Sequence, residues 1–250
     1  MGKPNLFATL GRMQIYAHRG ASADFPELTL AAYEGAVAQG ADGFECDLRL
    51  TKDEVPVLWH NASMLERAGN PGLIAEMTFA EVSRAYPQIL TLAEFLDFAV
   101  SKKKGVLLET KHPVISGNRI EEVIAQTLAA TSGNASIDVS VMSFSWGAIE
   151  KVKRLDSSLP TTFLMHHKTP FTLARLSSAA AIGPGIDLLR EKPELASNVG
   201  RGEMLPCVRM KTSSANVASP SPGIEVAGYS VAIFNIAGSD CTRAVEGPPD

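Results

Sequence analysis

The chain has 250 residues, of which 45% are hydrophobic and 20% are charged. Such a composition is typical of a globular domain with a sizeable core, and it excludes a disordered or fibrous protein for most of the chain. The net charge of -4 at pH 7 argues against nucleic-acid binding, which normally needs a basic surface to replace phosphate counterions. Three scattered cysteines are too few for a disulfide framework and favour a reducing compartment.

The two ends of the chain differ from its middle. Residues 1–14 contain no apolar stretch long enough for a signal peptide or a membrane span, so we expect a cytoplasmic protein without stable membrane association. Serine, proline and glycine become frequent after Gly200. We therefore interpret 1–13 as an extension, 14–200 as one domain and 201–250 as a divergent, irregular segment in which only Ile224–Ile236 has a strand pattern. No sequence signal indicates an oligomeric state.

Short apolar runs alternate with segments of helical periodicity, which is the pattern of repeated βα units. The predicted strands are Gln14–Ala17, Gly43–Leu50, Val55–Trp59, Gly105–Thr110, Ile137–Phe144, Pro160–Met165 and Gly185–Leu188. The predicted helices are Leu28–Gln39, Leu92–Ser101, Arg119–Ala130, Trp146–Arg154 and Pro170–Ala179, with Thr91 and Ser145 as caps of two of them. The order favours a (β/α)8 TIM barrel, since no glycine-rich dinucleotide loop follows the first strand of a doubly wound sheet.

Polar residues stand where the first strands end. The first strand runs into His18 and Arg19, with Glu27 in the loop that follows. On the next strand Glu45 and Asp47 share one face, because side chains alternate across a strand. A solvated pair on an edge strand is the alternative, but the apolar neighbours on either side favour a buried strand. Two buried carboxylates are costly without a cation, and hard divalent ions prefer oxygen ligands.

Two later strands also end in charged or titratable residues. Glu109 follows an apolar run, and Lys111 lies two residues further on the same side, where an ammonium can bind phosphate. His60 closes the short strand before it. A lone histidine is more often structural, but His18 and His60 together can supply an acid and a base near neutral pH.

Three sequence blocks resemble the glycerophosphodiester phosphodiesterase family. AHRGASADFPELT is similar to its His-Arg-Gly and Pro-Glu-Asn-Thr signature. GADGFECDLRLTKDEVPVLWHN resembles its second block, and LLETK its third. The resemblance implies an (α/β)8 barrel that hydrolyses glycerophosphodiesters, small-molecule substrates, to glycerol 3-phosphate and an alcohol.

The same resemblance implies a role for each matched residue. Glu45, Asp47 and Glu109 would bind one divalent ion, Mg²⁺ or Ca²⁺, and His18 and His60 would be the catalytic acid and base. The phosphate oxygens would be held by Arg19 and Lys111, and Glu27 would support the site. The attacking group is either water or the neighbouring glycerol hydroxyl, through a cyclic phosphate.

The sequence also departs from this family. Leu28 replaces the usual asparagine of the first block, and Asn61 the aspartate after the second histidine, so we expect tuned or weakened activity. The usual motifs of the last two strands are absent after Gly200, through divergence or a change of reading frame. We therefore expect the last one or two βα units to be degenerate, with an open sheet edge beside the first strand.

Two alternatives remain at this stage. Another phosphodiesterase on the same barrel, phospholipase C-like or sphingomyelinase D-like, normally needs apolar loops at the barrel mouth, and the sequence offers only Phe25 and Leu28. A non-catalytic binding protein with a relic site would explain the lost C-terminal motifs. The complete set of carboxylates and histidines argues for an enzyme.

Overall fold

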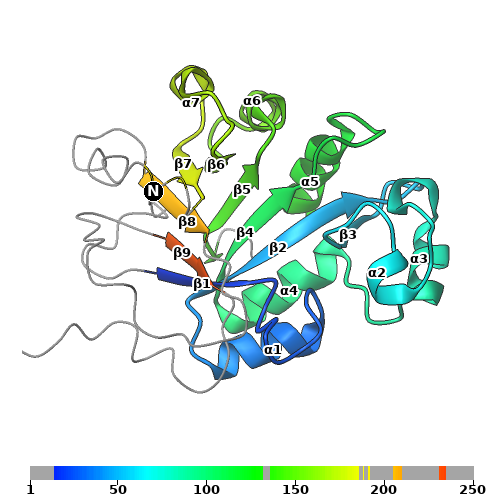
Figure 1. The fold of residues 1–250 in the computed structure, drawn as a ribbon. Helices are drawn as coiled ribbons and strands as arrows, with labels where there is room; N and C mark the ends of the chain where they lie inside the picture. Colours follow the sequence, from blue (N-terminus) through cyan, green and yellow to red (C-terminus); the bar gives the residue numbers. More distant parts are fainter. Residues whose placement is uncertain are drawn as a thin grey trace, which may run out of the picture.

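A ring of parallel strands forms the centre of the molecule (Figure 1). The computed structural model describes residues 14–131 and 136–185, Leu188 and Glu191, and the backbone of 205–209 and 231–234. The sheet has nine strands in the order β1-β9-β8-β7-β6-β5-β4-β2-β3, and β1 also pairs with β2. Because β3 is an antiparallel branch on β2, the remaining strands close on themselves, as in a (β/α)8 barrel.

The described strands are β1 Gln14–His18, β2 Gly43–Leu50, β3 Pro56–Leu58, β4 Gly105–Thr110, β5 Val139–Ser143, β6 Thr161–Met165, β7 Ala181–Pro184, β8 Leu205–Arg209 and β9 Val231–Phe234. The helices are α1 Leu30–Ala38, α2 Leu65–Ala68, α3 Phe79–Ala85, α4 Leu92–Lys102, α5 Arg119–Ala130, α6 Trp146–Leu155 and α7 Phe171–Leu176, with a 3-10 turn η1 at Ile74–Glu76. The order of β1 to β6 and their helices confirms the predicted βα units.

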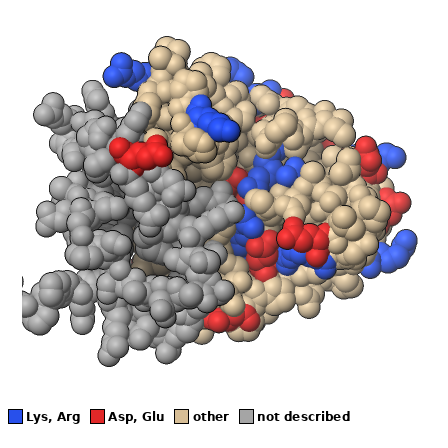
Figure 2. Space-filling model, in the orientation of Figure 1, with Lys and Arg blue, Asp and Glu red and all other residues tan. Residues whose placement is uncertain are grey.

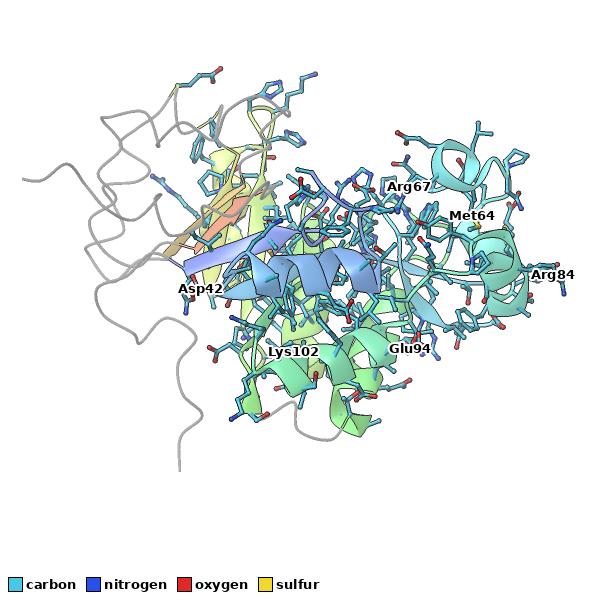
Figure 3. The ribbon with its side chains drawn as sticks, turned by 90° about the horizontal axis from the view of Figure 1, so that it is seen from below. Asp42, Met64, Arg67, Arg84, Glu94 and Lys102 are labelled. Carbon is cyan, nitrogen blue, oxygen red and sulfur yellow. The ribbon has the colours of Figure 1, made fainter. Side chains whose placement is uncertain are left out.

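The ring is covered from outside by helices whose apolar faces pack on the strands. Figure 1 shows α1 and α4 beneath the sheet, and Figure 3 shows Glu94 and Lys102 toward the two ends of α4. Between them and β2 lie Tyr33, Phe44 and Phe95, all fully buried, with ring centroids 4.6 to 6.2 Å apart. Edge-to-face and tilted aromatic pairs of this kind stabilise a core beyond their buried area.

The predicted helix caps are present. Thr91 forms a capping box with Glu94 at the start of α4, and the Ser145 hydroxyl accepts from the Ala148 amide at the start of α6. Each cap supplies an acceptor for an amide that has no partner within the helix. Thr29 caps α1 in the same way, so that helix begins at Leu30 and not at Leu28.

The segment between β3 and α4 contains three short elements that the sequence did not reveal. α2, η1 and α3 pack on Trp59, Met64, Ile74 and Val82 as a small separate core beside the barrel. α2 has four residues and η1 three, too few for helical periodicity to show. The capping box at the start of α3, Thr78 with Glu81, was the one readable signal.

Several predicted boundaries are wrong. The strand expected at Gly185–Leu188 lies at Ala181–Pro184, where pairing with β6 outweighs the low strand propensity of Gly183 and Pro184. The helix expected at Pro170–Ala179 ends at Leu176.

The C-terminal segment was predicted to be irregular, and β8 was not expected there. A strand is confirmed within Ile224–Ile236 at β9, which pairs with both β8 and β1. The predicted open edge beside β1 is therefore wrong. The remaining residues of 201–250, and the extension 1–13, lie outside the described residues.

A buried pair joins the end of β4 to α5, and its loss should destabilise the fold. His112 Nε2 lies 2.8 Å from Glu121 Oε1, and Glu121 is fully buried. His112→Ala would leave this carboxylate without its partner, so we expect the free energy of unfolding to fall by about 2–3 kcal/mol. Urea titration measures the change, and His112→Leu combined with Glu121→Leu should recover part of it. Equal losses in the single and the double variant would contradict this expectation, because the unpaired Glu121 carboxylate would then not be the cause of the loss.

Among the described residues, no helix has the length and apolar character needed to cross a membrane.

Candidate active site

The turn after β1 begins the site. Arg19 and Gly20 both have left-handed backbones, with φ values of 60° and 79°, and this turn directs the Arg19 side chain across the end of the barrel. Only glycine fits the second position, because a Cβ there would lie 2.7 Å from the Ala32 backbone. A left-handed conformation at a non-glycine residue is uncommon and often marks a functional site.

Leu28 closes the same loop, since its amide donates to the Arg19 carbonyl at 3.0 Å. Its φ of 61° is also left-handed, a conformation that asparagine adopts more readily than leucine. The loop therefore suits asparagine, the usual residue at this position in the family that the sequence resembles. The Leu28 side chain is buried in the main core, and its packing offsets the backbone cost.

Three carboxylates meet beside this turn. Glu45 and Asp47 point from β2, Glu109 points from β4, and the strand register places Asp47 opposite Glu109. Their ligand atoms lie within 4.8 Å of one another and all three residues are buried. The alternative that Glu45 and Asp47 form a solvated pair on an edge strand is therefore wrong, because β2 lies between β1 and β4. Buried, convergent oxygen donors are the set that a hard divalent cation prefers, so these residues fit a metal ion.

The residue between the two carboxylates of β2 faces the other way. Cys46 is fully buried in the main core, as the alternation of side chains predicts. Burial raises the pKa of its thiol well above the usual value, and the charges of Glu45 and Asp47 add to this effect. Cys46 therefore remains a protonated core residue, outside the chemistry of the site.

Two cations bind the carboxylates directly. Arg19 Nε lies 2.7 Å from Asp47 Oδ2 and Arg19 Nη1 lies 3.0 Å from Glu27 Oε2. Lys111 Nζ lies 2.6 Å from Asp47 Oδ1 and also contacts Glu109 Oε1. Burial lowers the pKa of Arg19, but the carboxylates of Asp47, Glu27 and Glu45 more than offset this, so its pKa is raised and it stays charged.

The two histidines have different surroundings. His18 is buried, with Nε2 3.8 Å from Glu45 Oε2. His60 is half-buried, and its Nδ1 lies 2.7 Å from Asn61 Oδ1. Burial lowers the pKa of His60 below its usual 6.5; Asp47 acts in the opposite direction, and the charges of Lys111 and Arg19 lower it further. At neutral pH His60 is therefore mainly the neutral imidazole, which can accept a proton.

Residues that sequence reasoning missed hold these groups in place. Arg49 Nε and Nη2 donate to the His60 carbonyl at 3.0 and 2.8 Å. Arg49 follows Glu45 and Asp47 at every second position of β2, so strand alternation could have identified it. Arg67 on α2 donates to the Glu27 carbonyl at 2.5 Å, and no sequence signal pointed to it because α2 itself was not predicted.

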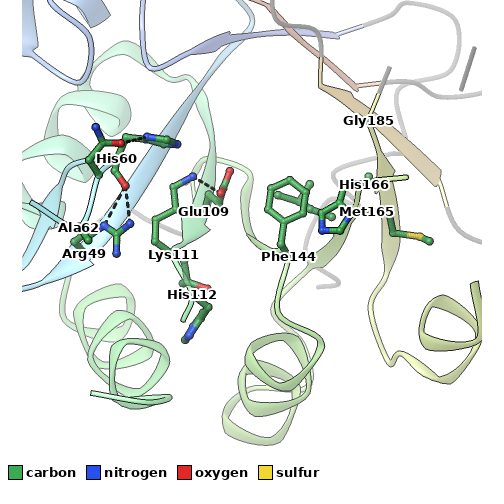
Figure 4. A pocket seen from close by; sticks show the side chains of 14 residues that line it. Arg49, His60, Ala62, Glu109, Lys111, His112, Phe144, Met165, His166 and Gly185 are labelled. Carbon is green, nitrogen blue, oxygen red and sulfur yellow. Dashed lines mark hydrogen bonds and ion pairs between the residues drawn. The ribbon is translucent and has the colours of Figure 1, made fainter. Parts of the chain in front are cut away.

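A cavity of about 550 Å³ opens above these groups. Figure 4 shows Arg49, His60 and Ala62 on one wall, Lys111 and Glu109 in the middle, and Phe144 and His166 on the opposite wall. The Phe144 and His166 rings are stacked, with centroids 6.0 Å apart. Figure 2 shows basic and acidic side chains meeting in this hollow of the surface. His18, Arg19, Glu45 and Asp47 are all at least nine-tenths buried and are not among the lining residues.

The sequence-predicted residues thus occupy one connected region. Ion pairs and hydrogen bonds join Glu27 to Arg19, Arg19 to Asp47 and Asp47 to Lys111. His60 shares the cavity with Glu109 and Lys111. Carboxylates for a cation, two positive groups for an anion and two histidines for proton transfer are what phosphoryl chemistry requires.

Solved structures resemble this fold. One is a Galdieria sulphuraria protein described as a putative glycerophosphodiester phosphodiesterase, with a TM-score of 0.73, 18% identity, and coverage of 91% of this chain and 96% of that chain. An Oleispira antarctica phosphodiesterase, solved with the product sn-glycerol-3-phosphate, has a TM-score of 0.68 and 22% identity, and the match covers 78% of this chain and 83% of that chain. At this identity the likeness establishes the barrel fold.

Sequence comparison is more specific. A Mycobacterium tuberculosis protein named "Probable glycerophosphodiester phosphodiesterase 1" is 35% identical over 225 residues, which cover 79% of this chain and 81% of the relative. The glycerophosphodiester phosphodiesterase of Bacillus subtilis is 30% identical over 207 residues, covering 70% and 69%. The model of the glycerophosphoryl diester phosphodiesterase family matches residues 18–200, from the first histidine of the site through the described barrel to β7 and beyond. The family expected from three short blocks is therefore confirmed, and this chain is a member of the glycerophosphoryl diester phosphodiesterase family.

Proposed function

We propose that this chain hydrolyses glycerophosphodiesters to glycerol 3-phosphate and an alcohol, with one divalent cation held by Glu45, Asp47 and Glu109. The observation that carries the proposal is the cluster of three buried carboxylates, with ligand atoms within 4.8 Å of one another, beside a cavity lined by a histidine and a lysine. The ion is Mg²⁺ or Ca²⁺, because both take oxygen ligands. Family membership supports the reaction class.

Each residue of the site has its own proposed role in the reaction. Lys111 lines the cavity and can bind a phosphate oxygen there, while Arg19 adds positive charge behind it. The cation, when bound, supplies charge that polarises the phosphoryl group. His60, whose pKa is lowered, takes the proton from the attacking oxygen, and His18, whose Nε2 lies 3.8 Å from the Glu45 carboxylate, protonates the leaving alkoxide.

Glu27, Arg67 and Arg49 are proposed to position these groups. Glu27 is held by Arg67 and in turn holds Arg19. Arg49 fixes the backbone of His60 through two hydrogen bonds to one carbonyl. Such support matters because a displacement of about 1 Å at a catalytic group can cost on the order of a hundredfold in rate.

The experiment that tests the function is a product assay. The purified chain is incubated with glycerophosphocholine and glycerophosphoethanolamine, and glycerol 3-phosphate is measured with an excess of chelator or after Mg²⁺ or Ca²⁺ is restored. We expect release of glycerol 3-phosphate only when the cation is present. Full activity in chelator would contradict the metal, and no release under any condition would contradict the function.

A change at Asn61 should move the pH dependence of this activity. Asn61→Asp would place a carboxylate beside His60 Nδ1, which is now 2.7 Å from an amide oxygen. The anion favours the imidazolium and so raises the pKa of His60, by about one unit for a close pair. Since the base must be neutral, the acidic limb of kcat/KM should move to higher pH by about the same amount.

The neighbour of Asn61 sets the design of this test. The Asn61 amide donates to Glu66, so a new aspartate there would face a second carboxylate. Asn61→Asp is therefore combined with Glu66→Gln, and Glu66→Gln alone is the control. A pH profile of kcat/KM that is the same in the double variant and the control would show that His60 is not the base.

A further inference from the structure

A second cavity, of about 370 Å³, adjoins the catalytic one. Arg49 and Ala62 line both cavities, so one wall is shared between them. The rest of its lining comes from the end of β2, from η1 and its approach, and from the loop between β4 and α5 with the first turn of α5. We call this cavity the side pocket. A substrate bound in the catalytic cavity would reach the side pocket past these two residues.

The lining of the side pocket is mainly apolar. It includes Leu50, Leu73, Ala75, Val114 and Ile120. The charged lining residue is Arg49, and its Nε and Nη2 donate to the His60 carbonyl. Figure 4 shows the head of Arg49 pointing toward His60. A ligand group in this pocket would therefore meet hydrocarbon, and pockets of this character bind apolar groups.

Exposed apolar side chains flank the same end of the barrel. Ile115, a lining residue of the side pocket, is 76% exposed. Phe25, Phe144 and Trp146 are also exposed, and each follows the carboxyl end of a parallel strand along the chain. The sequence-based view that only Phe25 and Leu28 were available there is wrong, since Leu28 is buried and three further residues are exposed.

We infer that the side pocket binds a hydrocarbon group of the substrate, so that the preferred glycerophosphodiesters carry an alkyl or acyl chain. This inference rests on the proposed function. A water molecule occupies about 30 Å³ in the liquid, so the cavity has room for roughly ten non-hydrogen atoms. The chain is attached either to the alcohol group or to the glycerol, and both attachments present the same chemistry to the pocket.

The experiment compares three soluble substrates with the metal-loaded enzyme. Glycero-3-phosphoethanol is the parent, glycero-3-phosphohexanol carries a chain on the alcohol side, and 1-hexanoyl-glycero-3-phosphoethanol carries one on the glycerol. Each buried methylene favours binding about fourfold, so four of them set a ceiling of roughly two-hundredfold. We expect kcat/KM for one of the two chain-bearing substrates to exceed that for the parent at least tenfold.

Two variants assign this preference to the side pocket. Ala75→Phe fills the pocket, and Ile115→Asp places a charge at its rim. Both should reduce the preference to less than about threefold and leave kcat/KM for glycero-3-phosphoethanol unchanged. The matched control is Leu176→Asp on α7, since Leu176 is 70% exposed and does not line the side pocket. This variant should keep the full preference.

The outcomes separate the two proposals. If the parent is hydrolysed and neither chain-bearing substrate is preferred, the pocket inference is wrong and the function stands. A preference that survives both Ala75→Phe and Ile115→Asp also overturns the inference, because the chain then binds elsewhere. If neither glycerol 3-phosphate nor its 1-hexanoyl ester is released from any of the three substrates, the proposed function fails, and the inference that rests on it fails with it.

Discussion

Asp47→Asn should lower kcat/KM for a glycerophosphodiester by at least about a thousandfold and weaken the binding of Mg²⁺ or Ca²⁺. A bound cation contributes several kcal/mol to stabilising the charge of a phosphoryl transition state, and about 1.4 kcal/mol corresponds to a factor of ten in rate. Asp47 is the central member of the cluster, because Arg19 and Lys111 both contact it. Its replacement by a neutral amide removes a proposed ligand and leaves these two cations facing each other.

Calorimetric titration with the metal alone gives a measurement that does not depend on turnover. The matched control is Cys46→Ala, on the opposite face of the same strand. It should lose stability as a core truncation and keep the wild-type affinity for the cation. If Asp47→Asn binds the cation as tightly as the wild-type protein, the metal lies elsewhere and the three carboxylates have another role.

His60→Ala should lower kcat by at least about a hundredfold, the usual scale for the loss of a general acid or base. The fold should survive. Arg49 binds the backbone carbonyl of residue 60 and not the imidazole, so alanine keeps that anchor. KM should change little, because the imidazole is proposed to act on the proton of the attacking oxygen. The kinetic constants and a thermal melt together measure both expectations.

His166 offers a matched control for this variant. It lines the opposite wall of the same cavity, where it stacks on Phe144, and among the described residues no carboxylate pairs with it. His166→Ala should therefore keep kcat within about threefold. Near-normal turnover by His60→Ala would make His60 a structural residue, and another group would have to take the proton.

His18→Ala is also expected to lower kcat by at least about a hundredfold, because His18 is proposed to protonate the leaving group.

Much of the site was predictable because its residues are tied to strand ends. Glu45 and Asp47 follow from the alternation of one strand, and Glu109 from the end of another. Their proximity does not follow from either segment alone. It depends on the register that sets Asp47 beside Glu109, a non-local pairing that the sequence does not encode in any short window.

The residues that were missed share a physical reason. Arg67, and the part of the side-pocket lining at Leu73 and Ala75, belong to the segment of α2 and η1. These elements are too short for helical periodicity to show in the sequence. The predicted position of β7 was wrong by a few residues, because the pairing with β6, and not the composition of β7 itself, decides where this strand forms. The cation pairs of Arg19 and Lys111 with Asp47 depend on side-chain reach across three strands, which spacing alone does not give.

The two neighbours of β1 in the ring have a consequence for how the molecule is made. β1 carries His18 and pairs with β2, close by in sequence, and with β9, where Tyr16 lies opposite Ile233. The first pairing can form early during synthesis, whereas the second must wait until nearly all of the described chain has left the ribosome. Contacts between such distant positions are the slow ones in folding. In a nascent chain β2 and β4, which carry the three carboxylates, would therefore already be paired while one edge of β1 is still open to other chains. We expect chaperone dependence and aggregation during expression to be governed by the late pairing of β9 with β1.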